Sequence, residues 1–295
     1  MPKRPSSLKI YSLVTLMTTW WSLNYIVAKY ALREFPPLMA SGIRMIFAGS
    51  IMLAVYSWRR SSRPRPSWTR SEIARLIVLG ILGVGLNQFF FVLGISMTTV
   101  SHAAIMVGLS PITVLFLAAA SGLEKLSALK LTGMVVALCG VGVLQLSSSK
   151  SDGATLLGDL LVYGAAFTFA LYTVRGKRET AKLDGVAVNT FAYVGSAVAM
   201  LPVTVGYAIG FDFARVTWVA WASLLYMAVF PSVICYSIYY YALTHVPASR
   251  VSAFSYLQPL LATTMAIPLL GEHPTKSLIA GGALVLAGVF LAERG

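Results

Sequence analysis

The most regular feature of the chain is a series of long apolar runs separated by short polar segments. The runs cover residues 10–32, 38–58, 73–96, 101–121, 129–146, 156–174, 186–209, 218–243, 248–270 and 277–292. About 20 apolar residues, rising ~1.5 Å each, are needed to cross a hydrocarbon core ~30 Å thick. Most of the runs lack the polar face that a water-soluble helix shows at helical spacing. The pattern predicts an all-α polytopic membrane protein with ten transmembrane helices.

Composition agrees with this prediction. Of the 295 residues, 57% are hydrophobic and 11% are charged, against roughly 25% charged in an average soluble protein. The basic residues Lys3, Arg4 and Lys9 resemble the start of a signal peptide, but the apolar run after them is too long and no small-x-small cleavage site closes it. We expect a retained first helix.

The net charge of +13 is scattered between the apolar runs, whereas a nucleic-acid surface gathers its charge on one face. With ten spans, 17 of the 23 Lys and Arg residues fall in segments on the same side as the N-terminus and four fall on the other side. Cytoplasmic loops retain positive charge. We therefore expect both termini to be cytoplasmic, in a bacterial inner membrane.

The chain also repeats itself at an offset of 148 residues. The pairs in register include Pro111/Pro259, Glu124/Glu272, Ser101/Ser249, Gly133/Gly281 and Gly140/Gly288. This predicts two five-helix units, residues 1–147 and 155–295, joined by a small polar linker at 148–154. Because five is odd, the second unit would enter the membrane inverted, as in many secondary transporters. A duplication that only builds a stable helix bundle is the alternative.

Several short motifs carry a family resemblance. The first run contains Trp21-Ser22-Leu23-Asn24-Tyr25, the second contains Arg44, and the fourth and ninth each hold a proline followed by a glutamate turn, Gly122-Leu123-Glu124 and Gly271-Glu272. With these motifs the chain resembles the EamA family of the drug/metabolite transporter superfamily. It departs from the family pattern at Ser22, where Gly is more usual, and at Phe169, where Trp is frequent. The resemblance implies a ten-helix bundle with a central cavity and export of amino acids, aromatic ones among them, related metabolites or toxic compounds.

Charged residues inside a span are costly, by ~2.5 to 3.5 kcal/mol at mid-bilayer. Lys29 lies close enough to the outer end of its span for the ammonium to reach water. Arg44 lies about two turns inside its span, so either it faces a substrate cavity or it forms a structural ion pair.

Polar and aromatic residues within the spans are the other substrate candidates. A buried amide needs a partner from another helix or from a substrate, and an aromatic wall suits a planar or apolar solute. The substrate-cavity candidates are Trp21, Asn24, Arg44, Asn87, Gln88, Tyr172, Tyr239, Tyr256 and Gln258.

Three further features concern the backbone. Pro111 and Pro259 each remove a helical hydrogen bond and are hinge candidates or static bends. The glycine pairs 133/140 and 281/288 are seven residues apart, hence on one helix face, and predict close helix packing. We expect Glu124 and Glu272 to cap the helix that comes after each of them.

Other function classes lack their signatures. The sequence shows no filter loop or ring of like residues for a channel, no paired catalytic groups for an enzyme, and no phosphate-binding loop for ATP. We expect no cofactor or metal, and a monomer whose partners are the bilayer and a small substrate. The sequence thus predicts a secondary or facilitative transporter working by alternating access, with its direction and energy coupling open.

Overall fold

The computed structural model describes residues 6–61, 69–95, 97–98, 100–145, 155–180, 184–270 and 276–295. Glu272, the linker at 148–154 and the side chains of Lys29 and Ser101 lie outside this description. The described residues are helical, with short turns and no strand among them.

Each apolar run coincides with helix, within a few residues at either end. In the first part of the chain these helices are α1 (Ser7–Leu32), α2 (Pro37–Ser61), α3 (Arg70–Gly80), η1 (Ile81–Gly85), α4 (Leu86–Ile95), α5 (Val100–Gly108), α6 (Ser110–Ala120) and α7 (Ala128–Gln145). In the second part they are α8 (Leu156–Thr180), α9 (Gly185–Ala208), η2 (Phe213–Arg215), α10 (Trp218–Met227), η3 (Ala228–Ile234), α11 (Cys235–His245), α12 (Ala248–Ala253), η4 (Phe254–Tyr256), α13 (Leu257–Leu270) and α14 (Lys276–Arg294).

Among the described residues, seven helical stretches are long and apolar enough to cross a membrane. They are Pro37–Arg59, Arg70–Gly94, Ala128–Gln145, Leu156–Thr180, Gly185–Ala208, Trp218–His245 and Lys276–Arg294. Local signals mark several helix starts: Thr69 and Glu72 form a capping box at α3, and Asp184 caps α9.

Two of these stretches are continuous but contain a turn of π-helix. The first is η1, between α3 and α4, and the second is η3, between α10 and α11. Shifting Ile81–Gly85 by the repeat offset of 148 places it inside η3. A π-helical turn carries one extra residue and frees a carbonyl from the helical ladder, and such turns are frequent at functional sites.

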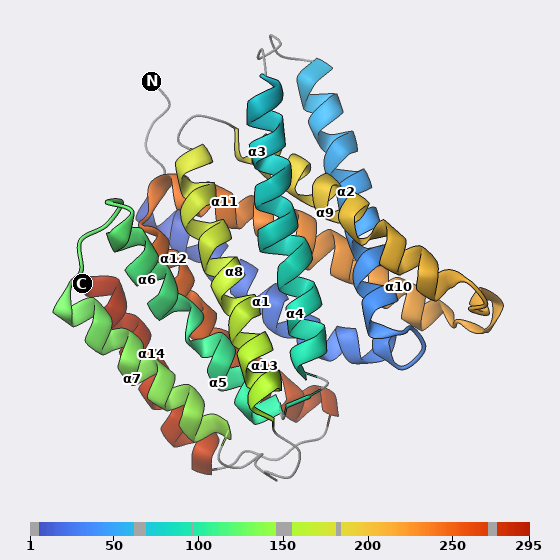
Figure 1. Cartoon of the computed structure of the whole chain (residues 1–295). Coiled ribbons are helices and arrows are strands. Elements are labelled where there is room, and N and C mark those ends of the chain that lie inside the picture. Colours follow the sequence, from blue (N-terminus) through green and yellow to red (C-terminus); the bar gives the residue numbers. More distant parts are fainter. Residues whose placement is uncertain are drawn as a thin grey trace.

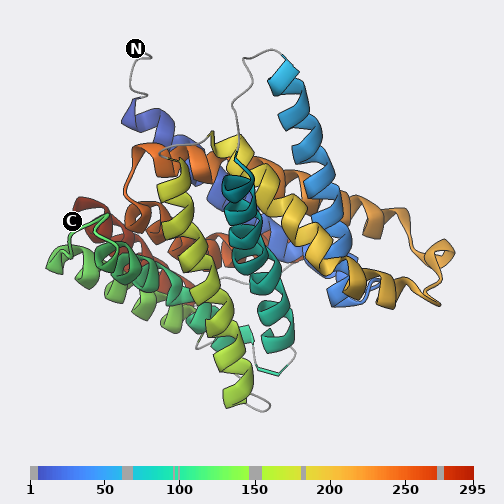
Figure 2. The ribbon, with the colours of Figure 1, turned by 45° about the horizontal axis from the view of Figure 1, so that its top comes forward.

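The closest helix packing joins α7 to α14. A Cβ atom on Gly133 would lie 2.7 Å from the carbonyl oxygen of Gly288, and one on Gly140 would lie 2.8 Å from that of Gly281. Since only hydrogen fits at these four positions, the prediction that the glycine pairs serve helix packing is confirmed. Figures 1 and 2 both show the green α7 beside the red α14, while the blue α2 crosses the yellow α9 on the opposite flank.

The remaining contacts interleave the two parts of the chain. Helix α8 packs against α4 and α6, while α1 packs against α10, α11 and α13. The largest core cluster, which includes Tyr172, Tyr193, Tyr236 and Tyr240, fills the space between these helices.

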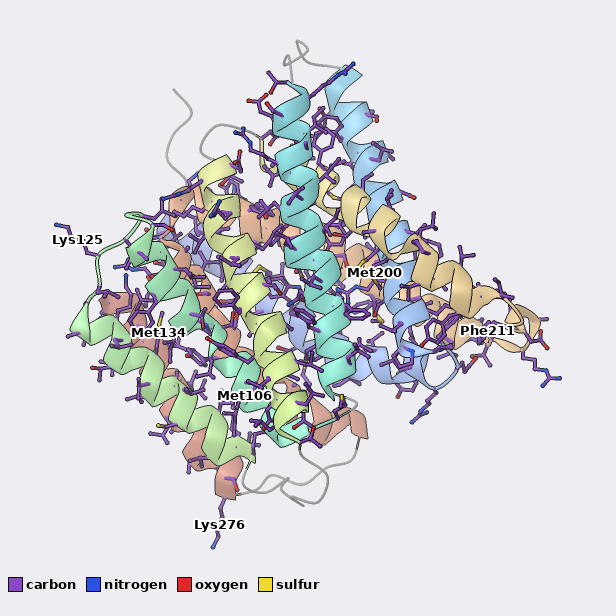
Figure 3. The ribbon with its side chains drawn as sticks, viewed as in Figure 1. Met106, Lys125, Met134, Met200, Phe211 and Lys276 are labelled. Carbon is purple, nitrogen blue, oxygen red and sulfur yellow. The ribbon has the colours of Figure 1, made fainter. Side chains whose placement is uncertain are left out.

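Polar contacts join many helix ends at one end of the bundle. Tyr11 of α1, Glu124 after α6, Arg178 of α8 and Arg250 of α12 each contact another segment there. We call this the basic end; Lys125 lies near it, and Lys276 lies at the far end of the α7–α14 pair (Figure 3).

Candidate functional site

The site is built around Arg44, two turns from the start of α2. Its Nε donates a hydrogen bond to the hydroxyl of Ser232 at 2.9 Å, and that hydroxyl donates to the carbonyl oxygen of Met227 at 3.0 Å. Ser232 lies in η3 and is fully buried. Among the described acidic residues, none forms an ion pair with Arg44. The sequence predicts that Arg44 either faces a substrate cavity or forms a structural ion pair. The described part of the structure provides no carboxylate for the ion pair.

The same π-helical turn is held from a second side by α1. The indole Nε1 of Trp21 donates to the carbonyl oxygen of Pro231 at 3.0 Å. Pro231 has no N–H to donate within the helix, so η3 lacks a regular backbone hydrogen bond there. Side chains bind this region of η3 instead. Trp21 and Arg44 are thus positioned by one backbone irregularity.

Aromatic rings continue the site away from Arg44. Tyr236 lies at their centre, with ring centroids 5.7 Å from Trp21, 5.4 Å from Tyr193 and 6.1 Å from Tyr172. Edge-to-face pairs at such distances add to the stability that burial gives. We call the following residues the aromatic cluster: Trp21, Phe169, Tyr172, Tyr193, Tyr236, Tyr239 and Tyr240.

The aromatic cluster lies between the two π-helical turns. On one side Trp21 binds η3. On the other, Tyr172 packs so closely on η1 that a Cβ on Gly83 would lie 2.2 Å from the Cβ of Tyr172. The hydroxyls of Tyr239 and Thr173 are 2.6 Å apart, which orients the Tyr239 ring.

The predicted amide residues divide into two groups. Asn87 donates from Nδ2 to the carbonyl oxygen of Ala165 at 2.7 Å, which is the interhelical bond weighed as its alternative role. Gln88 is half-buried on α4. Asn24, on α1 one turn beyond Trp21, has a buried Oδ1 without a hydrogen-bond partner in the described structure. Of the three amides predicted on α1 and α4, Asn24 is thus the one with a buried oxygen that has no described partner.

Tyr256 is not brought to the aromatic cluster. Tyr256 belongs to a separate core cluster with Leu115 and Met134, and its ring lies near Gly108. Tyr256 and Gln258 lie where α12 gives way through the 3₁₀ turn η4 to α13. Both stay substrate-cavity predictions, with Tyr256 in a core cluster separate from the aromatic cluster.

Both candidate hinge prolines coincide with interruptions in their helices. Helix α5 ends at Gly108 and α6 restarts at Ser110, with Pro111 in its first turn. On the other side η4 precedes α13, which contains Pro259. Beside the first interruption is a wide-open groove of about 380 Å³ between α6 and α8, lined by Leu109, Ile112, Thr113, Phe116, Leu117, Tyr163 and Phe167. Its walls are almost entirely apolar.

The prediction for Glu124 is wrong about its partner. Glu124 does not cap α7, the next helix along the chain; Ser127 accepts from the backbone N of Lys130 there, at 3.5 Å. Instead Glu124 accepts from the backbone N of Ser249, at 3.1 Å, and from its hydroxyl. The start of α12 is the nearer set of unpaired backbone donors once the two parts of the chain pack together.

Comparison with known proteins decides the family. The model of the EamA-like transporter family matches residues 8–146 and again residues 156–293. An uncharacterized transporter of Archaeoglobus fulgidus is 30% identical over 96% of both chains. The chain belongs to the EamA-like transporter family.

Other relatives agree. The uncharacterized transporter YetK of Bacillus subtilis is 26% identical, over 91% of this chain and 82% of that protein. A probable amino-acid metabolite efflux pump of Salmonella typhimurium is 26% identical, over 95% and 93% of the two chains. A solved crystal structure at 18% identity superposes with a TM-score of 0.80 over 96% of both chains, which shows a shared fold. This EamA protein is therefore an integral membrane protein of a transporter family and not an enzyme.

Sequence reasoning missed several members of this EamA site. Ser232, Tyr193, Tyr236 and Tyr240 were not among the predicted cavity residues, and neither π-helical turn was foreseen. One signal was present: Gly83 and Pro231 stand at the repeat offset of 148, and both residue types disturb a helix.

Proposed function

We propose that this EamA protein exports amino acids with aromatic or large apolar side chains, by alternating access of two inverted five-helix halves. Arg44 carries the proposal. It is a permanent cation within a span, its Nε is bound by a neutral hydroxyl, and no described carboxylate neutralises it. Such a guanidinium binds a carboxylate strongly, with two parallel hydrogen bonds when the geometry allows.

The neighbours of Arg44 fit the rest of such a solute. The rings of the aromatic cluster, buried against one another beside Trp21, suit an apolar side chain once they part to admit it. Asn24, one turn along α1 from Trp21, has a buried carbonyl oxygen that can accept from an ammonium group. The relative named as a probable amino-acid metabolite efflux pump supports the same class.

The inverted arrangement has three supports. The family model matches the chain twice, and the π-helical turns recur at the repeat offset. Helix contacts between the halves also occur in equivalent pairs. The contact of α4 with α8 becomes, at that offset, the contact of α11 with α1, and the contact of α6 with α8 becomes that of α13 with α1. We take residues 1–147 and 155–295 as the halves, with Pro111 and Pro259 as hinges between conformations. We further propose that the protein has ten spans and is a monomer. In the proposed orientation the basic end and both termini face the cytoplasmic side of a bacterial inner membrane.

Counterflow in liposomes tests the substrate. Vesicles loaded with unlabelled phenylalanine should take up labelled phenylalanine, and R44Q should lower the rate by about 10- to 100-fold, since a hydrogen bond to a charged group is worth ~1.5 to 3 kcal/mol. R44K should recover part of the rate, because it restores the charge but not the planar fork. R59Q is the matched control, since Arg59 is on the same helix but lies 4.0 Å from Asp184 at its end.

A second substrate class has one observation in its favour: the open groove between α6 and α8 is apolar. If phenethylamine, which lacks the carboxylate, were carried as fast as phenylalanine and R44Q were without effect, the protein would be an exporter of apolar toxic compounds instead. Repeating the assay with and without a pH gradient tests the coupling; we expect equal rates, as for facilitated export, because few titratable groups lie within the spans.

A further inference from the structure

The start of α12 is held by a buried charged group from the first half of the chain. Glu124, in the turn after α6, accepts from the backbone N and the hydroxyl of Ser249. Lys130 lies 3.4 Å from the same carboxylate, and the Lys130 and Glu124 side chains are only 6% and 5% exposed. We call Glu124, Lys130 and Ser249 the Glu124 clamp.

A second contact holds the next residue of α12. The guanidinium of Arg250 lies 3.6 Å from Glu293 of α14, and Glu293 also accepts from the hydroxyl of Tyr11 of α1. Two consecutive residues at the start of α12 are therefore bound to the α6–α7 turn and to the ends of α1 and α14. All of these contacts lie at the basic end.

Helix α12 is short and separate from the next helix along the chain. It spans Ala248–Ala253, with five of its residues buried, and gives way to η4 before α13 and Pro259. A helix fixed at its start and interrupted at its end can turn as a unit, because the interruption absorbs the change in backbone angles. Releasing its start removes one of the contacts that hold it in place, beside its packing against α6.

The sequence places two of the three members of the Glu124 clamp, Glu124 and Ser249, in the repeated pattern. Glu124 and Ser249 have the same residue types 148 positions away, at Glu272 and Ser101, which lie outside the described side chains. Neither residue type is required by an apolar helix bundle, so the repetition indicates a part of the mechanism that both halves share.

We infer that the Glu124 clamp closes the basic end of the transport pathway and that α12 is the segment whose movement opens it. The inference rests on the proposed alternating-access function. Glu124 acts as a positioning residue: it holds α12 and does not bind the solute. Breaking the clamp shifts the protein toward the state open at the basic end.

Thiol labelling tests this without any substrate. In a C139S/C235S background, A253C places a reporter on α12 where the native side chain is 1% exposed. A membrane-impermeant maleimide is applied to two vesicle preparations, one for each orientation of the protein. The cysteine of A253C should be labelled from the basic end about tenfold faster in E124A than in the parent. This factor corresponds to a shift of ~1.4 kcal/mol between the closed and open states. S249A should give a smaller increase, since it removes only the hydroxyl donor.

The matched control is E34A. Glu34 also accepts from a backbone N and a hydroxyl, those of Thr217, but at the opposite end. It should not raise labelling of A253C from the basic end. Equal labelling of parent and E124A, in protein that keeps its folded elution profile, would overturn the inference, as would an equal rise in E34A.

Cross-linking provides the converse experiment. E124C and S249C, joined through a short methanethiosulfonate spacer, should stop transport, and reductant should restore it; transport that continues after complete cross-linking contradicts the inference. Since labelling needs no solute, a failure to carry amino acids would refute the proposed substrate and leave the Glu124 clamp to be judged by labelling alone.

Discussion

At each end of the bundle, a glutamate from a turn accepts two hydrogen bonds from the start of a distant helix. At the basic end Glu124 accepts from the backbone N and hydroxyl of Ser249. At the other end Glu34 accepts from the backbone N of Thr217, at 2.6 Å, and from its hydroxyl, at 2.7 Å. The donor groups are the same, but Glu124 is buried beside Lys130 whereas Glu34 meets water.

This difference in surroundings decides what each contact is worth. Around Glu34, water replaces either hydrogen bond at little cost. Glu124 and Lys130 have given up most of their water, so losing one partner strands the other charge in an apolar medium. The same hydrogen-bond pattern is thus costly to break at the basic end and cheap to break at the other end.

The largest expected effect comes from removing the cation. K130M leaves Glu124 charged and buried, so the free energy of unfolding in detergent should fall by ~3 to 5 kcal/mol. The double variant K130M/E124Q should regain much of this loss, because the carboxylate that K130M leaves uncompensated is removed as well. If the two single losses simply add in the double variant, Glu124 and Lys130 are not coupled.

A smaller loss should result from K177M, at the same end. The ammonium of Lys177 donates to the carbonyl oxygens of Leu243, at 2.9 Å, and Val246, at 2.5 Å. Without it two carbonyls lose a donor, which should lower the free energy of unfolding by ~1 to 3 kcal/mol. K125M, an exposed lysine of the same end, should stay within ~0.5 kcal/mol of the parent protein. Equal stability of K177M and K125M would show that Lys177 does not contribute to the stability of the basic end.

The smallest effect belongs to E34Q, and its dependence on pH identifies the cause. The backbone N–H of Thr217, and then its hydroxyl, hold the pKa of Glu34 below its usual value by stabilising the carboxylate. The stabilisation is therefore present above pH ~4.3 and is lost as the pH falls through the lowered pKa. The difference in Tm between parent and E34Q should be small at neutral pH and shrink on acidification. A difference that grows in acid contradicts this assignment.

Much of the fold could be predicted because its causes are local. The apolar run 129–146 predicts α7, found at Ala128–Gln145, since the length of an apolar run is a property of the chain alone. Gly133 and Gly140 predict close packing because a missing side chain on one helix face admits another backbone. Pro111 predicts an interruption, which falls next to Leu109.

The site could be predicted only in part. Trp21, Arg44, Tyr172 and Tyr239 do lie together, as their depth within the spans indicated. Tyr256 does not join them, because η4 directs it into another core cluster. Depth in the membrane is visible in the sequence, whereas the side of a helix that faces the centre depends on how that helix is packed.

By itself the sequence determined the helices, their interruptions at Pro111 and Pro259, the internal repeat and the residues whose charge or size is unusual at membrane depth. Tertiary structure alone decided the partners: Ser249 for Glu124, 125 residues away, and Ser232 for Arg44, 188 residues away. The reason is physical. Helix formation in an apolar medium is settled within each segment by its own backbone bonds, while the pairing of two polar side chains exists only after separate helices have packed against one another.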